Sequence, residues 1–227
     1  MFDLDGTLFD TRRDLATAVN TTRAEFGLPP LALATVTSYV GDGLAVLVRR
    51  ALPGHRKALP EATLRCARHY RRHMLDRTIP YPGVVAGLRR LKKAGYRLAL
   101  ISNKPVSACR RILRHFGLAS LFDRVSGGDS TTRRKPHPEP LHLTMRVLGV
   151  RPDESWMIGD HKTDLETAHR AGVRSVWLSR GMGRRGRRRP DLVFRRFSEL
   201  TAFFIAPQGE KPVSHAGEAA AQSIHLL

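Results

Sequence analysis

Short apolar segments alternate with longer amphipathic segments from about residue 84 onward, and this alternation constrains the fold more than any other feature. The short segments are predicted as strands, and helical periodicity marks the longer ones. Strands that alternate with helices indicate a parallel sheet in an α/β fold. The predicted strands are 97–102, 122–126, 155–158 and 173–178, and the predicted helices are 84–94, 105–116, 138–148 and 162–171.

A pair of aspartates, Asp3 and Asp5, stands near the start of the chain and is followed by Gly6 and Thr7. Side chains two residues apart on a strand point to the same face, so both carboxylates can face one substrate. One can attack phosphorus and form an aspartyl-phosphate, while the other protonates the leaving oxygen and later activates water. We predict Asp3 as the nucleophile and Asp5 as the acid/base. A surface turn is the alternative, because Asp-Gly is a common turn dipeptide.

Three later segments carry residues suited to the same chemistry. Ser102 follows an apolar run and precedes a helix, where a hydroxyl and helix amides bind anions; a plain helix cap is the alternative. Lys135 stands before a proline-rich stretch, and a fixed ammonium neutralises phosphate charge; a solvated loop lysine is the alternative. Asp160 ends the third predicted strand, and Asp164 shares its face once a helix begins; helix capping by Asp160 is the alternative.

In chain order these segments are Asp-x-Asp-Gly-Thr, strand-Ser, Lys-Pro and strand-Gly-Asp-x-x-x-Asp. Together they resemble the four motifs of the haloacid dehalogenase superfamily of phosphohydrolases, over about residues 1–205. The resemblance implies a Rossmann-like parallel sheet with the site at the carboxyl ends of its strands. It also implies Mg²⁺ as cofactor, an ion that prefers oxygen ligands, and phosphoryl transfer by positioning and charge neutralisation.

The resemblance assigns a role to each motif residue. Asp3 is implied as nucleophile and Mg²⁺ ligand, and Asp5 as acid/base and as a ligand through its backbone carbonyl. The presence of Asp5 argues against a true dehalogenase, since those relatives lack this residue. Gly6, which allows close backbone approach, and Thr7, which adds a hydroxyl, are predicted to bind substrate. The remaining implied roles are phosphoryl binding by Ser102 and the amide of Asn103, a bridge between nucleophile and phosphate by Lys135, metal ligation by Asp160 and support by Asp164.

About 70 residues without a clear strand separate Asp10 from Pro82, with helices expected near 34–50 and 61–77. This insertion resembles the helical cap of the phosphoglycolate phosphatase-like branch, and such a cap excludes water and selects the leaving group. The composition after 206 is rich in Pro, Gly, Glu, Ala, Ser and Gln and predicts a disordered tail. The expected domains are 1–10 with 83–205 as core, 11–82 as cap and 206–227 as tail.

The predicted activity is hydrolysis of a small phosphorylated metabolite, with 2-phosphoglycolate as the first candidate. A sugar-phosphate phosphatase, a pyrophosphatase and a phosphosugar mutase of the same superfamily stay open, because the residues that set specificity lie in the cap. The sequence does not define the oligomeric state.

The formal net charge is +19, and arginine supplies 32 of the 39 basic residues. Such a charge can attract nucleic acid, and an arginine-rich binding protein on an impaired phosphatase scaffold is the alternative function. The arginines are spread along the predicted helices, however, and aromatics, which stack on bases, form only 7% of the chain. Codon usage that favours arginine explains the excess, so we expect no nucleic-acid partner. The cluster at 184–189 is expected on the active-site side, where it attracts anionic substrates.

Only Met1 and Phe2 precede Asp3, whereas the resemblance implies several apolar residues that form the central strand. A truncated central strand is expected to leave backbone groups unpaired and the nucleophile near a fraying end. Either the natural protein starts upstream, which we favour, or catalysis is impaired.

Other sequence features are less informative. No apolar run of about 18 residues predicts a membrane span, and no secretory signal is visible. The two cysteines stand at unrelated places, as expected for a reducing cytoplasm. His161 is interpreted as a solvated loop or capping residue, and an influence on the groups around the metal is the alternative.

Overall fold

The computed structural model describes residues 1–207 and contains the expected parallel sheet. Strand β3 (Ala99–Ile101) pairs with β4 (Arg124–Ser126), and β5 (Trp156–Gly159) pairs with β6 (Arg174–Leu178), which pairs with β7 (Leu192–Phe194). Every one of these pairings is parallel. The predicted Rossmann-like α/β fold is confirmed, and the four predicted strands are found within two residues of their expected bounds.

The first three residues occupy the centre of the sheet, between β3 and β5. Phe2 forms parallel bridges to Leu100 and to Ile158. Phe2 N donates to Ala99 O at 2.8 Å, and Asp3 N donates to Ile158 O at 2.9 Å. The expectation of unpaired backbone groups is therefore wrong for these residues, because even so short a segment pairs with both neighbouring strands.

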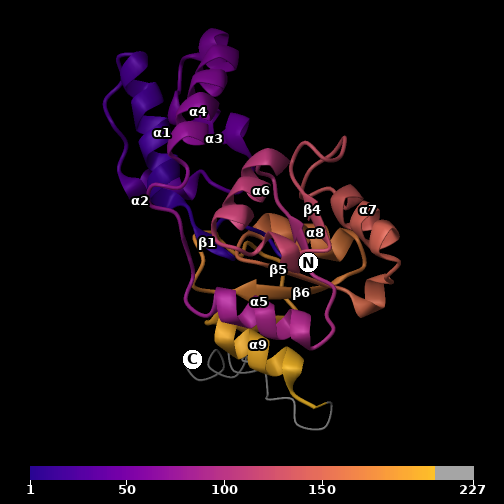
Figure 1. Ribbon diagram of the computed structural model, residues 1–227. Coiled ribbons are helices and arrows are strands. Elements are labelled where there is room, and N and C mark those ends of the chain that lie inside the picture. The colour runs from indigo at the N-terminus through magenta and orange to yellow at the C-terminus, as the bar shows by residue number, and fades with distance from the viewer. Residues whose placement is uncertain (208–227) are drawn as a thin grey trace, which may run out of the picture.

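Helices cover both faces of the sheet (Figure 1). One face packs against α5 (Val84–Lys93), α6 (Val106–His115) and α9 (Phe197–Ile205), and the other against α7 (Glu139–Leu148) and α8 (Lys162–Arg170). Neighbouring strand residues alternate between the two cores: Leu100 and Ile158 belong to the larger core, Ile101 and Met157 to the smaller one. This period of two is what a strand buried on both faces requires.

A second group of helices stands to one side of the sheet (Figure 1) and is called the α1–α4 bundle. Its members are α1 (Arg12–Glu25), α2 (Leu33–Ser38), α3 (Leu44–Ala51) and α4 (Leu59–His73). The single helix expected near 34–50 is instead two helices, because Gly41 and Gly43 between them adopt φ values of 120° and 89°. Positive φ is readily accessible to glycine and incompatible with a continuous right-handed helix.

Two short strands join the bundle to the sheet-bearing part of the chain. β1 (Phe9–Asp10) pairs antiparallel with β2 (Ile79–Pro80). Just beyond them, the buried Asp14 carboxylate accepts hydrogen bonds from the amides of Arg77 and Thr78 and from the Thr78 hydroxyl. The segments that enter and leave the bundle are thus fastened to each other.

No helix within residues 1–207 is long and apolar enough to span a membrane. Cys66 and Cys109 are both free and buried. The tail predicted for 206–227 lies almost wholly outside the described residues.

Candidate active site

Residues that end the parallel strands meet at one edge of the sheet. Asp3 follows the central segment, Ser102 follows β3 and Asp160 follows β5. All three are buried. Parallel strands bring their carboxyl ends together, which is why residues far apart in sequence converge here.

Lys135 connects two of the predicted site carboxylates. Its Nζ lies 2.9 Å from Asp3 Oδ1 and 2.6 Å from Asp164 Oδ1, and its side chain is only 2% exposed. Burial disfavours the charged lysine, but Asp164 and Asp3 outweigh that cost and raise the pKa of Lys135. The ammonium therefore stays charged next to the predicted nucleophile.

Asp160 is held from three sides by hydrogen bonds. Its Oδ1 accepts from the Thr7 hydroxyl at 2.7 Å, and its Oδ2 accepts from the amides of Met182 and Gly183 at 2.8 Å each. A Cβ on Gly6 would collide with the Asp160 carboxylate, and Gly6 has a φ of 87°. Gly6 and Thr7, predicted to bind substrate, thus lie against Asp160 and fix its orientation.

Three carboxylates form a cluster with the ligand chemistry of a metal site. Oxygen atoms of Asp3, Asp160 and Asp164 lie within 4.8 Å of one another. Burial raises the pKa of Asp160 to about 8, and Asp164 and Asp3 add to that shift. Burial also raises the pKa of Asp3 to about 6 against the opposing effect of Lys135. Mutually repelling buried carboxylates with one neighbouring ammonium fit a hard divalent cation.

Asp5 points away from this cluster and contacts a different set of groups. Its Oδ1 accepts from the Thr11 hydroxyl at 2.7 Å, and its Oδ2 lies 2.9 Å from Lys104 Nζ. The Lys104 ammonium also lies 4.4 Å from the ring centroid of Tyr70, which belongs to α4. Burial opposes the charge on Lys104, but Asp5 and Tyr70 more than offset it and raise its pKa. Sequence reasoning assigned no role to Lys104 or Tyr70.

Asn103 links the sheet to the bundle and to Lys135. Its side-chain amide donates to Gly41 O at 2.9 Å and to Lys135 O at 3.0 Å. Its neighbour Ser102 donates its own amide to Ser126 O, in β4. The hydroxyl of Ser102 accepts from Lys104 N at 3.4 Å. The backbone of the predicted phosphoryl-binding pair is therefore well fixed, and both residues line the same cavity as Asp5.

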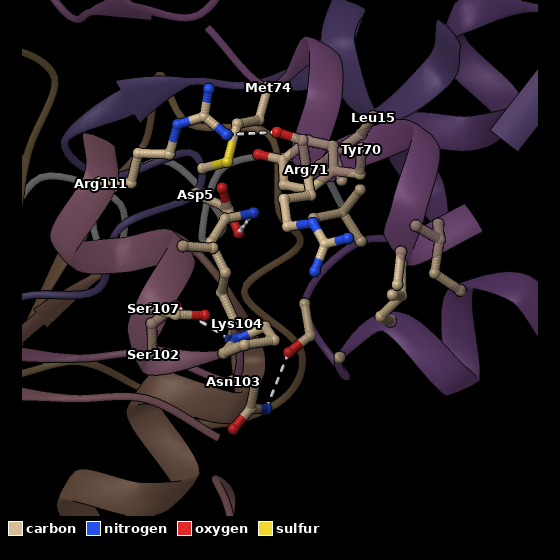
Figure 2. A pocket seen from close by; sticks show the side chains of 18 of the residues that line it. Asp5, Leu15, Tyr70, Arg71, Met74, Ser102, Asn103, Lys104, Ser107 and Arg111 are labelled. Atoms are coloured by element: carbon tan, nitrogen blue, oxygen red, sulfur yellow. Dashed lines mark hydrogen bonds and ion pairs between the residues drawn. The ribbon is translucent and has the colours of Figure 1, made fainter. Parts of the chain in front are cut away.

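These groups open into a cavity of about 660 Å³ between the sheet edge and the α1–α4 bundle. Asp3, Asp5, Ser102 and Asn103 line it on one side. Figure 2 shows Lys104 pointing up to Asp5, with Tyr70 and Arg71 of the bundle across from them. The cavity is large enough for a small phosphorylated metabolite.

Residues 1–178 match the model of the haloacid dehalogenase-like hydrolase family. The chain belongs to this family. A phosphoglycolate phosphatase of Cereibacter sphaeroides is 40% identical over 188 residues, 80% of this chain and 84% of that protein. A phosphoglycolate phosphatase of Pseudomonas putida is 41% identical over 187 residues, 80% of this chain and 69% of that protein.

A solved structure gives the same result. The crystal structure of a predicted phosphoglycolate phosphatase from Haemophilus somnus has a TM-score of 0.83 and 30% identity, covering 88% of this chain and 94% of that one. The predicted superfamily and its phosphoglycolate phosphatase-like branch are confirmed.

In this haloacid dehalogenase-like hydrolase, His161 caps α8, in agreement with one of its two interpretations. The His161 ring accepts from Thr163 N, and Asp164 Oδ2 accepts from His161 N. Asp160, the other candidate for the cap, precedes the cap position. Burial lowers the pKa of His161.

The arginine cluster at 184–189 begins directly after the amides that hold Asp160. Arg184 O accepts from Lys162 N at 2.8 Å, at the start of α8, and Arg188 lies 3.9 Å from Glu166. The cluster thus lies at the active-site edge of the sheet. Its effect on anionic substrates stays a prediction.

Mg²⁺ is expected to raise the melting temperature of this hydrolase more at about pH 8 than at about pH 5. Because the pKa of Asp160 is raised from 3.8 to about 8, the metal-free fold loses stability as pH rises through that window. A proton on Asp160 at low pH is expected to compete with a cation at the carboxylate cluster. Differential scanning fluorimetry with and without Mg²⁺ measures the effect, and Asp160→Asn should flatten its pH dependence. An equal Mg²⁺ shift at both pH values would contradict the prediction.

Proposed function

We propose that this protein hydrolyses 2-phosphoglycolate through an aspartyl-phosphate on Asp3. The observation that carries the proposal is the setting of Asp3: a buried carboxylate beside the Lys135 ammonium, on the wall of a cavity that Asp5 also lines. The names of the relatives support phosphoglycolate as the substrate. The class of enzyme is a phosphoric monoester hydrolase.

The reaction then runs in two displacements. An Asp3 oxygen attacks phosphorus, the ester P–O bond breaks, and Asp5 donates its proton to the departing glycolate oxygen. Asp5 next takes a proton from a water molecule whose oxygen attacks the phosphoryl group. The P–O bond to Asp3 breaks, and inorganic phosphate leaves. Ser102, the Asn103 amide and Lys135 hold the phosphoryl oxygens throughout.

Mg²⁺ fits the carboxylate cluster, with Asp3, Asp160 and the backbone carbonyl of Asp5 as its proposed ligands. When bound, the cation neutralises charge on the phosphoryl group. Asp164 supports the arrangement through its contact with Lys135 at 2.6 Å. Thr7 and the amides of Met182 and Gly183 keep Asp160 in place.

The α1–α4 bundle acts as a cap in this proposal, with 11–82 as cap and the segments 1–10 and 83–205 as core. Support comes from the cavity, which residues of both parts line. A closed cap excludes water while the aspartyl-phosphate forms. A cytoplasmic location, with Cys66 and Cys109 kept reduced, belongs to the same proposal.

Phosphate release from a panel of substrates tests the proposed function. With Mg²⁺, kcat/KM for 2-phosphoglycolate is expected to exceed those for glucose 6-phosphate and pyrophosphate by roughly tenfold or more, as a selective site allows. A chelator should abolish the activity, and added Mg²⁺ should restore it. Faster hydrolysis of a sugar phosphate or of pyrophosphate would overturn the substrate assignment. Full activity with the chelator would overturn the role of the metal.

A further inference from the structure

The cavity wall next to Asp5 contains a polar group that the reaction steps do not use. Tyr70 is 6% exposed, and its hydroxyl lies near Lys104 without forming a hydrogen bond of normal geometry. Burial raises the pKa of Tyr70 to about 12, so the group remains a neutral donor. A buried hydroxyl without a well-formed hydrogen bond is costly, and the place of Tyr70 on the cavity wall lets its hydroxyl donate to a ligand.

Lys104 offers further donors at the same place. Its ammonium has three N–H bonds, and within the described residues its charged contacts are Asp5 at 2.9 Å and the Tyr70 ring face. Figure 2 shows Lys104 close to Asp5, with Tyr70 across from them and Arg111 above. Arg111 donates to the backbone carbonyl of Arg71, which joins α6 to the bundle.

The charge of the lining also favours an anion here. Five cationic side chains line the cavity against two carboxylates, Asp3 and Asp5; the cations are Arg68, Arg71, Lys104, Arg111 and Arg114. The phosphoryl group is assigned to Asp3, Ser102 and Lys135. The excess positive charge of the lining is therefore left for a second anionic group on the substrate.

We propose that the Tyr70 hydroxyl and the Lys104 ammonium form a carboxylate subsite, which selects phosphomonoesters with a carboxylate one carbon from the ester oxygen. The inference rests on the proposed function, because Asp5 marks the position of the leaving oxygen. A carboxylate one methylene away from that oxygen falls beside Asp5, within reach of Lys104. Lys104 can then contact both Asp5 and the substrate carboxylate.

Tyr70→Phe tests the subsite, since it removes one oxygen and keeps the ring under Lys104. The readout is the ratio of kcat/KM for 2-phosphoglycolate to kcat/KM for ethyl phosphate, which lacks the carboxylate. The ratio is expected to fall by about 10- to 100-fold, the effect of a lost hydrogen bond to a charged group. The melting temperature should change little, because the hydroxyl forms no hydrogen bond of normal geometry and the ring keeps its contact with Lys104.

Tyr96→Phe is the matched control. The Tyr96 hydroxyl donates to Phe204 O at 2.7 Å, outside the cavity, so this change should leave the ratio intact. An unchanged ratio in Tyr70→Phe, or an equal loss for both substrates, would overturn the subsite. If the wild-type protein hydrolyses neither substrate, the proposed function fails. Calorimetric binding of 2-phosphoglycolate then decides the subsite alone: weaker binding to Tyr70→Phe supports it, and equal binding rejects it.

Discussion

Asp3→Asn is expected to lower kcat for 2-phosphoglycolate by about 10⁴-fold or more, in line with the loss of a nucleophile in other covalent catalysts. The amide cannot form the aspartyl-phosphate, and the two other carboxylates of the cluster are engaged: Asp160 with Thr7 and two amides, and Asp164 with Lys135. Steady-state phosphate release measures the change, and mass spectrometry of the acid-quenched protein should show phosphorylated Asp3 in the wild type alone.

The fold should tolerate this substitution, because Lys135 keeps its 2.6 Å contact with Asp164. Asp153→Asn is a suitable control, since Asp153 pairs with Arg151 on the exposed surface. That variant should match the wild type in rate. If Asp3→Asn retained about a tenth of the wild-type kcat, another residue would have to be the nucleophile.

Asp164→Ala is expected to destabilise the protein by about 3–5 kcal/mol, the usual cost of removing one partner from a buried ion pair. Asp164 is fully buried, contacts Lys135 Nζ and accepts from His161 N at the start of α8. Its loss leaves an ammonium and an amide short of partners. Chemical denaturation of the metal-free protein measures the change in free energy of unfolding.

A double variant distinguishes the ion pair from simple loss of packing. Lys135→Met combined with Asp164→Ala should be less destabilising than the sum of the two single changes. Each single change leaves one charge of the pair without its partner, whereas the double variant removes both charges. Glu166→Ala, on the exposed side of the same helix, is the control and should cost little. Additive effects of the two buried substitutions would show that Lys135 and Asp164 act independently.

The periodic parts of the fold were predictable from the sequence for a physical reason. Strands such as β5 and β6 are buried on both faces and are read as apolar runs, and α8 follows β5 directly. Parallel pairing then sends Asp3, Ser102 and Asp160 to one edge. The order of the motifs was enough to predict that these residues lie together, because parallel pairing brings the carboxyl ends of their strands to one edge of the sheet.

Contacts that depend on loops or on the bundle were not predictable. Nothing in the sequence around Tyr70 distinguishes it from an ordinary buried helix residue, and its contact with Lys104 exists only because α4 lies over the sheet edge. The amides that hold Asp160 come from Met182 and Gly183, in a glycine-rich stretch without regular periodicity. The break between α2 and α3 did have a local signal in the sequence, the glycines at 41 and 43. Both adopt positive φ in the structure.

The paired strands β1 and β2 limit how the α1–α4 bundle can move. Both crossings of the chain lie side by side, with Phe9 opposite Pro80, and Asp14 ties them together just beyond. Two adjacent attachments define a single hinge axis along one edge of the bundle. In the proposed function, substrate entry and product release would use the same rotation of the cap about this axis, so a cross-link across the mouth of the cavity is expected to block both.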